Sequence, residues 1–262
     1  MSFHDIVFQT QGKRKEQEDA FTIFQLDDKI CVAIFDGHSC GNNDSLSLDL
    51  ATRLPKIFNF FFQKRSFNET NIIDFFQRLD TASMKHISGT CACLFFAEKD
   101  DVYFAMVGDT EAIVIQDKIL YAFTLHNFKN DKEVKRYRDV GMSIHKYRYC
   151  GLNISRTFGD SKIRTTSKHP LAPIPSIQHF KVQNPIHVFM FTDGIRELVQ
   201  NSDFAAIVEG GYKTKIATFE KKLEKHEFYD NATLIAFEYS YKKDKIDEIK
   251  NEIKETSKLF YF

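Results

Sequence analysis

Apolar and polar residues alternate along nine short stretches of the chain, a pattern that is typical of half-buried β-strands. Turn-forming residues separate several neighbouring stretches, as in DDK, KDD and QDK, so we expect antiparallel strands joined by short hairpins. The nine stretches are AFTIFQL (20–26), ICVAIF (30–35), CACLFF (91–96), VYFAMV (102–107), AIVIQ (112–116), ILYAFTL (119–125), SIQHFKV (176–182), HVFMFT (187–192) and TLIAFEY (233–239).

Apolar residues spaced three and four positions apart predict helices between these strands. The clearest apolar stripe consists of Leu46, Leu50, Leu54, Ile57 and Phe61. Helices are predicted over 44–64, 71–86, 131–140, 212–226 and 242–258, and an irregular loop is predicted over 161–175, where three of the five prolines lie. No repeat or linker divides the chain, so we expect one domain over 1–262 in which the strands form a sandwich.

Charge and cysteine content narrow the function classes. Lys plus Arg and Asp plus Glu number 36 each, so no global charge directs the 262-residue chain to nucleic acid or to an acidic membrane. No secretory signal or membrane-spanning stretch is evident, and an odd count of five cysteines without a C-x-x-C pair favours a reducing compartment, so we expect a cytoplasmic protein. Cys91 and Cys93 are interpreted as small buried strand residues, and we assign no zinc site.

Acidic residues gather where the predicted strands begin or end. Glu18 and Asp19 precede the strand at 20–26, Asp36 follows 30–35, Asp109 follows 102–107, Asp193 follows 187–192, and Asp230 precedes 233–239. A single carboxylate at a strand end is usually a solvated turn residue. Several carboxylates brought to one rim repel each other unless cations neutralise them, and oxygen ligands suit Mg²⁺ or Mn²⁺. The pattern therefore favours a divalent metal site.

Seven motifs in order resemble the metal-dependent serine/threonine phosphatases, also called protein phosphatase type 2C. They are RKEQEDAF, FDGHSCG, SGTCACL, VGDTEA, GLNISRTFGD, FTDGIRE and YDNAT, and the resemblance covers residues 12–239. The resemblance implies an α+β fold with a central antiparallel β-sandwich and helices on both outer faces, which agrees with the order of elements predicted above.

The resemblance also implies the ligands of two Mg²⁺ or Mn²⁺ ions. Asp36 would bridge both ions, and the backbone carbonyl of Gly37 would bind beside it, since glycine allows close approach of the backbone. Glu18 would bind one ion, and Asp193 and Asp230 would bind the other. A water between the ions would attack phosphorus, without a covalent enzyme intermediate.

Further roles follow from the same resemblance. Arg14 would bind the phosphoryl oxygens and His38 would protonate the departing seryl or threonyl oxygen. Taken alone, Arg14 would be a surface arginine and His38 a structural histidine. Asp19 is expected to support the metal ligands, and Asn231 is expected to orient Asp230 or its water.

Several positions depart from the family pattern. Glu111 stands where the family has an arginine, and Arg196 and Glu197 stand where it often has tryptophan and aspartate. Asp109 and Glu197 are the candidate ligands of a weaker third ion, for which the longer stem of Glu197 is less suited. Substrate recognition and the third ion are therefore the features most affected by the departures.

The favoured function is hydrolysis of phosphoserine and phosphothreonine in proteins at a dinuclear Mg²⁺ or Mn²⁺ site. The alternative is a catalytically weak, phosphatase-like binding module, but the five core ligand positions are all occupied by suitable residues. A calcium-binding or structural sandwich would not require Arg14 and His38 beside the acids. The expected partners are phosphorylated proteins, with no nucleic acid, and we expect a monomer.

Overall fold

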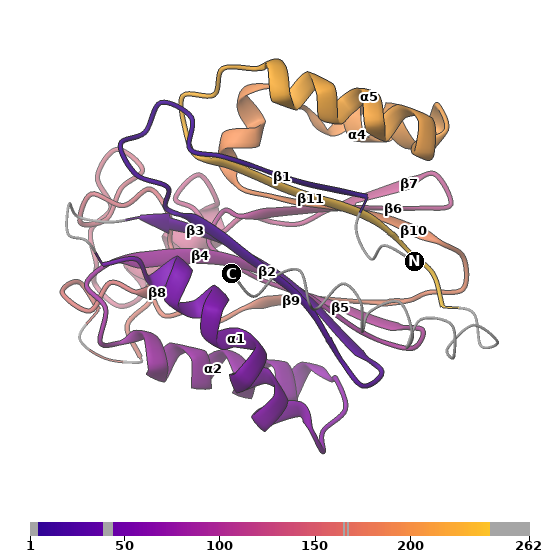
Figure 1. Cartoon of the computed structure of the whole chain (residues 1–262). Helices are drawn as coiled ribbons and strands as arrows, with labels where there is room; N and C mark the ends of the chain where they lie inside the picture. The colour runs from indigo at the N-terminus through magenta and orange to yellow at the C-terminus, as the bar shows by residue number, and fades with distance from the viewer. Residues whose placement is uncertain (1–4, 39–43, 165, 167, 242–262) are drawn as a thin grey trace.

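The computed structural model describes residues 5–38, 44–164, 166 and 168–241. The helix expected at 242–258 lies outside these residues. Two antiparallel sheets pack face to face in the described part, with a pair of helices on each outer face (Figure 1). The predicted α+β class and the four layers are confirmed.

The first sheet consists of five strands and the second of six. The first sheet, in order of pairing, contains β1 (Ile6–Thr10), β11 (Ala232–Tyr239), β10 (Ile186–Phe191), β6 (Glu111–Gln116) and β7 (Ile119–Ala122). The second contains β2 (Asp19–Leu26), β3 (Lys29–His38), β4 (Gly89–Glu98), β5 (Asp101–Val107) and β9 (Ser176–Lys181), and the short β8 (Phe158–Gly159) pairs with β4. The three predicted hairpins β2–β3, β4–β5 and β6–β7 are therefore confirmed.

The helices cover the sheets on opposite sides. They are α1 (Leu46–Phe62) and α2 (Glu69–Ser83) on the second sheet, α4 (Asn201–Glu209) and α5 (Tyr212–Lys225) on the first, α3 (Asp131–Arg138) beside the sandwich, and the 3₁₀ helix η1 (Asp193–Glu197). Side-chain caps start α1 and α2, since Ser45 and Asn68 accept hydrogen bonds from backbone N–H groups of the first turn.

The alternation along β3 explains how one strand serves two cores. Cys31, Ala33 and Phe35 pack toward α1 and α2, whereas Val32 and Ile34 pack against the other sheet. Because neighbouring side chains of a strand point to opposite faces, a strand that is buried on both sides becomes a continuous apolar run. The sheets thus form the two inner layers, and the strand ends remain available for polar residues.

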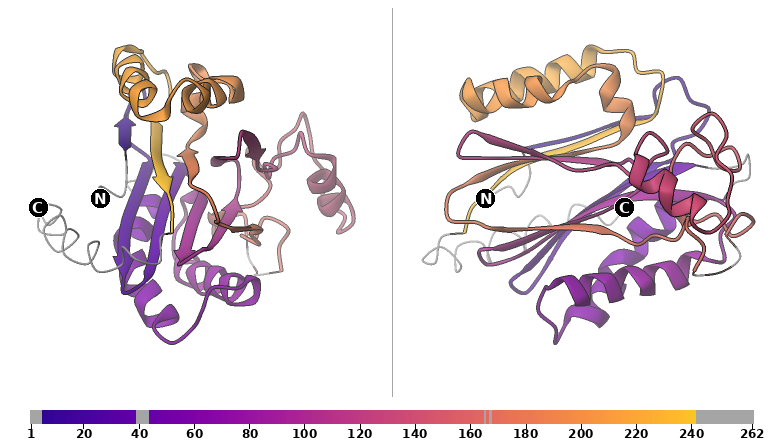
Figure 2. Two further views of the ribbon diagram at one scale, coloured as in Figure 1. Left: turned by 90° about the vertical axis from the view of Figure 1, so that its right-hand side faces the viewer. Right: turned by 180° about the vertical axis from the view of Figure 1, so that it is seen from behind.

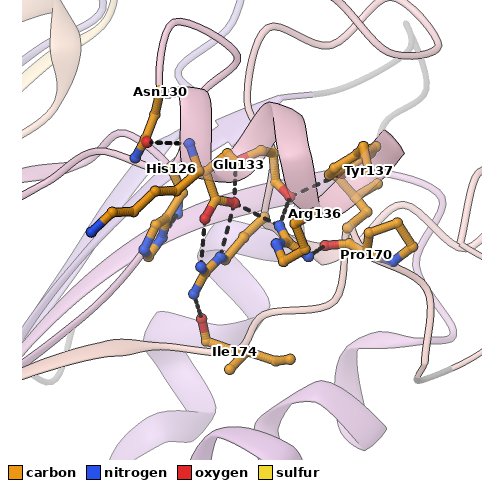
Figure 3. A network of polar contacts seen from close by, with 12 residues as sticks. His126, Asn130, Glu133, Arg136, Tyr137, Pro170 and Ile174 are labelled. Carbon is orange, nitrogen blue, oxygen red and sulfur yellow. Dashed lines mark hydrogen bonds and ion pairs between the residues drawn. The ribbon is translucent and has the colours of Figure 1, made fainter. Parts of the chain in front are cut away.

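A side lobe (residues 126–156) projects from one end of the sandwich and contains α3 (Figure 2). Within the lobe, the buried carboxylate of Glu133 accepts hydrogen bonds from the guanidinium groups of Arg136 and Arg156 and from the hydroxyl of Ser155 (Figure 3). Arg156 also donates to the backbone oxygen of Ile174 at 2.6 Å. The network ties the lobe to the irregular segment that returns to β9.

Four elements were not expected from the sequence: β1, α4, the two-residue strand β8 and the 3₁₀ helix η1. Strand β1 covers only IVFQT, and its pairing partner is β11, far along the chain. Helix α4 has nine residues, too few for a clear helical period. The described residues of the predicted loop 161–175 contain no helix or strand, as expected. Within the described part of the chain, no helix is long and apolar enough to span a membrane.

Candidate active site

The first group of candidate ligands lies where β2 begins and β3 ends. Asp19 is directly opposite Asp36 in the antiparallel pair, and Glu18 immediately precedes β2. The N–H of Gly37 donates to the backbone oxygen of Glu18 at 3.2 Å. A Cβ at position 37 would lie 2.3 Å from that oxygen, so only glycine permits this approach of the two backbones.

The second group comes from the other sheet. Asp193 is the first residue of η1, two positions after the last residue of β10, and Asp230 lies two residues before β11. Phe191 pairs with Leu234, so the end of β10 adjoins the beginning of β11. Asp193 and Asp230 therefore lie at the same end of the first sheet.

Asp19 connects the two groups. It is buried, and its Oδ2 accepts hydrogen bonds from the hydroxyl groups of Thr192 and Thr233, each at 2.8 Å. Thr192 follows the last residue of β10 and Thr233 lies in β11, so one carboxylate joins the second sheet to the first. This contact fixes the strand ends that carry the candidate ligands relative to each other.

Asn231 fastens the segment before β2. Its Oδ1 accepts from the N–H of Glu18 at 2.8 Å, and its Nδ2 donates to the backbone oxygens of Gln11 at 2.7 Å and Glu16 at 3.0 Å. Only its backbone N–H donates to Asp230 Oδ1, at 2.8 Å. The Asn231 side chain thus positions Glu18, and the expectation that it orients Asp230 or its water stays a prediction.

The carboxylates influence each other strongly. Burial, followed by the charges of Asp19, Asp193, Asp109 and Asp230, raises the pKa of Asp36 well above its ordinary value. Asp193 is exposed as a residue, yet the protein atoms around its carboxyl group desolvate it and, with the charges of Asp109, Asp230 and Asp19, raise its pKa to about 7. Such shifts are expected for carboxylates that converge without enough positive charge to balance them.

The donor set fits hard divalent cations. All candidate side-chain donors are carboxylate oxygens, and the buried Oε1 of Glu18 has no hydrogen-bond partner among the described residues. Within the same residues, no three Asp, Glu, His or Cys side chains already surround one point closely enough to hold an ion. The carboxylates are therefore gathered at one rim without forming a closed set of ligands.

Arg14 and His38 lie beside these acids. Arg14 Nη2 is 2.6 Å from Asp230 Oδ2, and about half of the arginine side chain is exposed. His38 is the last residue of β3 and lines a cavity of about 260 Å³ together with Glu18 and Gly37. The structure thus brings a guanidinium group to the rim and places an imidazole at a cavity that borders it.

Comparison with known proteins identifies the family. The protein phosphatase 2C family model matches residues 4–228, which is most of the chain. The chain belongs to the protein phosphatase 2C family. The predicted recognition is thereby confirmed, and metal-dependent dephosphorylation is the activity of this family. A search of curated proteins found no match.

Solved structures show the same protein phosphatase 2C fold. A C. elegans sex determining protein is 20% identical, with a TM-score of 0.72, and the match covers 92% of this chain. This chain spans 66% of that protein's length. A phosphatase from a pathogenic strain of Toxoplasma gondii is 16% identical with a TM-score of 0.72, covering 90% of this chain and 93% of the other. A bacterial serine phosphatase is 19% identical with a TM-score of 0.64, covering 92% and 99% respectively. At these identities the similarity shows the fold.

Two departures from the protein phosphatase 2C pattern compensate each other. Arg196 donates from Nε to Glu111 Oε1 at 2.8 Å and from Nη2 to Glu111 Oε2 at 2.5 Å. Both side chains are largely buried, and a paired guanidinium and carboxylate is the arrangement that such charges require there. Glu111 and Arg196 therefore form an internal ion pair between β6 and η1.

The candidate ligands of a third ion lie in different surroundings. Asp109 borders a cavity of about 210 Å³ together with Asp193, and the thiol of Cys91 donates to Asp109 Oδ1 at 3.3 Å. Glu197 accepts from the backbone N–H groups of Tyr229 and Asp230, both at 2.9 Å. Asp109 is thus beside Asp193, and Glu197 already supports the segment that carries Asp230. The third-ion role of both residues stays a prediction.

Asp160 lies within one of the family motifs, and no role was predicted for it from the sequence. Its Oδ2 lies 2.9 Å from His38 Nε2, although 122 positions separate the two residues. The only signal was its place at the end of GLNISRTFGD, after the short strand β8. The contact becomes visible only when β8 pairs with β4.

Proposed function

We propose that this protein phosphatase 2C hydrolyses phosphoserine and phosphothreonine in proteins at a site for two Mg²⁺ or Mn²⁺ ions. The observation that carries this proposal is the convergence of acidic strand ends from both sheets, where burial and mutual repulsion raise the pKa values of Asp36 and Asp193. In this proposal Glu18, Asp36 and the carbonyl of Gly37 hold ions on the β2–β3 side. Asp193 and Asp230 hold them on the β10–β11 side.

When bound, such ions supply a hydroxide-like water near neutral pH and offset charge on the phosphoryl group. The guanidinium group of Arg14 binds phosphoryl oxygens, for which its planar pair of N–H donors is suited. Arg14 is anchored on Asp230 Oδ2, so the same contact keeps it directed along the rim.

The leaving oxygen receives its proton from His38. Cleavage of the bond between phosphorus and the seryl or threonyl oxygen leaves an alkoxide-like oxygen, and an imidazolium can donate the proton that makes it a neutral hydroxyl. His38 suits this task because its side chain is 26% exposed and lines the cavity beside Glu18 and Gly37. Asp19 and Asn231 hold the segments that carry these groups.

A third, weaker ion is assigned to the neighbourhood of Asp109 and Asp193. Both border the smaller cavity, and burial of Asp109 is the largest cause that raises its pKa. Glu197 could contribute only by giving up hydrogen bonds to the N–H groups of Tyr229 and Asp230. We therefore expect a weak third site.

Turnover of a phosphothreonine peptide with Mn²⁺, Mg²⁺ or excess chelator tests this function. Activity should appear with metal and disappear with chelator. Asp36→Asn and Asp193→Asn should each remove nearly all of it, since a neutral amide replaces an anionic ligand. Asp74→Asn, on the exposed face of α2, is the matched control and should behave as wild type. A folded, metal-loaded protein without turnover would instead support the binding-module alternative.

A further inference from the structure

The imidazole of His38 is hydrogen-bonded to a carboxylate outside the proposed metal ligands. Asp160 follows β8 directly, and its side chain is 2% exposed. Its Oδ2 lies 2.9 Å from Nε2 of His38. A carboxylate of this kind, almost sealed from solvent, needs a hydrogen-bond donor, and the imidazole supplies one.

The backbone around this contact is shaped to accommodate it. Gly89 is opposite His38 across β3 and β4 and opposite Gly159 across β4 and β8. A Cβ on Gly89 would lie 2.1 Å from Asp160 Oδ2 and 2.2 Å from His38 Nε2. Any other residue at position 89 would therefore push the imidazole and the carboxylate apart.

The backbone of Asp160 is held as firmly as its side chain. Its N–H donates to the backbone oxygen of Ser88 at 3.0 Å, and its backbone oxygen accepts from the N–H of Arg164 at 2.8 Å. Its φ of 52° is in the left-handed region, which Asp and Asn tolerate better than most residues. The chain thus adopts an uncommon conformation at the point where the carboxylate meets the imidazole.

This contact determines which ring nitrogen is free. An ionised carboxylate only accepts hydrogen bonds, so Nε2 of His38 carries a hydrogen and donates it. Nδ1 has no hydrogen-bond partner within the described part of the chain. Nδ1 is then the nitrogen that is available to a substrate.

We propose that Asp160 is a positioning residue that fixes the His38 ring through Nε2–H, so that Nδ1–H is the proton donor to the leaving group. The inference rests on the proposed function. When the bond between phosphorus and the seryl or threonyl oxygen breaks, the Nδ1 proton moves to that oxygen, and the ring keeps the Nε2 hydrogen that Asp160 accepts. Asp160 exchanges no proton and contacts no substrate.

Asp160→Asn tests this role, because Asn keeps the left-handed backbone and the volume while removing the charge. The variant should lower kcat for a phosphothreonine peptide by about 10–100-fold, a part of the about 10²–10⁴-fold that a general acid contributes. KM should stay nearly unchanged. Hydrolysis of an aryl phosphate should change little, because a phenolate leaves without a proton donor.

A double-mutant cycle separates positioning from a general effect on the fold. In a His38→Gln background, Asp160→Asn should cause no further loss, since the group that it positions is absent. Gly89→Ala should reproduce the leaving-group dependence of Asp160→Asn, because the added methyl group separates the side chains of His38 and Asp160 without changing either residue. Asp74→Asn, on the exposed face of α2, is the matched control and should leave the leaving-group dependence unchanged.

NMR of protein labelled with ¹⁵N-histidine provides a readout that does not depend on activity. Chelator-treated wild type should show a slowly exchanging Nε2–H signal from His38, and Asp160→Asn and Gly89→Ala should lose it. Two results would overturn this inference alone: losses of kcat from His38→Gln and Asp160→Asn that multiply in the double variant, or an Asp160→Asn enzyme that loses equal activity on the peptide and on the aryl phosphate. A wild-type protein without any metal-dependent turnover would overturn the proposed function as well.

Discussion

Replacing the buried carboxylate of Glu133 with an amide should destabilise the protein in a way that depends on pH. Glu133 is 3% exposed and accepts hydrogen bonds from Arg156 at 2.5 and 3.1 Å and from Arg136 at 2.6 Å (Figure 3). Glu133→Gln keeps the volume and removes the charge. It leaves two largely buried guanidinium groups without their common partner.

The size of the effect follows from the pKa of Glu133. Although burial opposes ionisation, the hydrogen bonds from Arg156, Arg136 and Ser155 outweigh it and lower the pKa from 4.5 to about 2. This difference corresponds to about 3 kcal/mol of unfolding free energy. Because the folded-state pKa is lowered, the contribution is present in full above pH 4.5 and is lost as the pH falls toward 2.

Urea unfolding at pH 7.5 and pH 3.5 measures this contribution. The free energy of unfolding should fall by about 3 kcal/mol in Glu133→Gln at pH 7.5, and the difference from wild type should shrink to about 2 kcal/mol at pH 3.5. Glu224→Gln, on the exposed surface of α5, is the matched control and should change little at either pH. An equal effect of the two substitutions, or a loss that does not shrink in acid, would refute the reasoning.

Two further predictions concern the departures from the family pattern. Glu197→Asp should raise the Mn²⁺ concentration for half-maximal rate by about 10-fold, because the shorter side chain loses its hydrogen bonds to the segment that carries Asp230. If Glu197 binds a third ion, the substitution should instead lower this concentration, and a titration of the rate with Mn²⁺ distinguishes the two outcomes. Arg196→Met and Glu111→Leu should each lower the free energy of unfolding by about 3 kcal/mol, and the double variant should recover most of this loss. Additive losses in urea unfolding would show that the two charges do not interact.

The sequence predicted the layers well because hydrophobic periodicity is a local signal. Helix α1 was expected over 44–64 and spans Leu46–Phe62, and α5 was expected over 212–226 and spans Tyr212–Lys225. Strand β1 was missed because five residues carry a weak period and its pairing partner is β11. Hydrophobic periodicity indicates which residues face a core, but it does not indicate which distant strand pairs to complete a sheet.

The site was predictable in its residue types and less so in its connections. Family motifs indicated Asp36 and His38, and the structure places both at the end of β3. No pattern indicated that Asn231 would bind the N–H of Glu18, 213 positions away, or that Asp160 would bind His38. Such contacts arise from the packing of two sheets, and a motif carries no information about them.

Titration of chelator-treated protein with Mn²⁺, while hydrolysis of a phosphothreonine peptide is recorded, tests the central claim most directly. If the acidic strand ends of both sheets form a metal-dependent phosphatase site, hydrolysis is absent at the start and rises to saturation as Mn²⁺ binds. In Asp193→Asn the rate stays near zero over the same range of Mn²⁺ concentration. A wild-type rate that is already maximal in chelator, or an Asp193→Asn variant that follows the wild-type curve, would contradict the account.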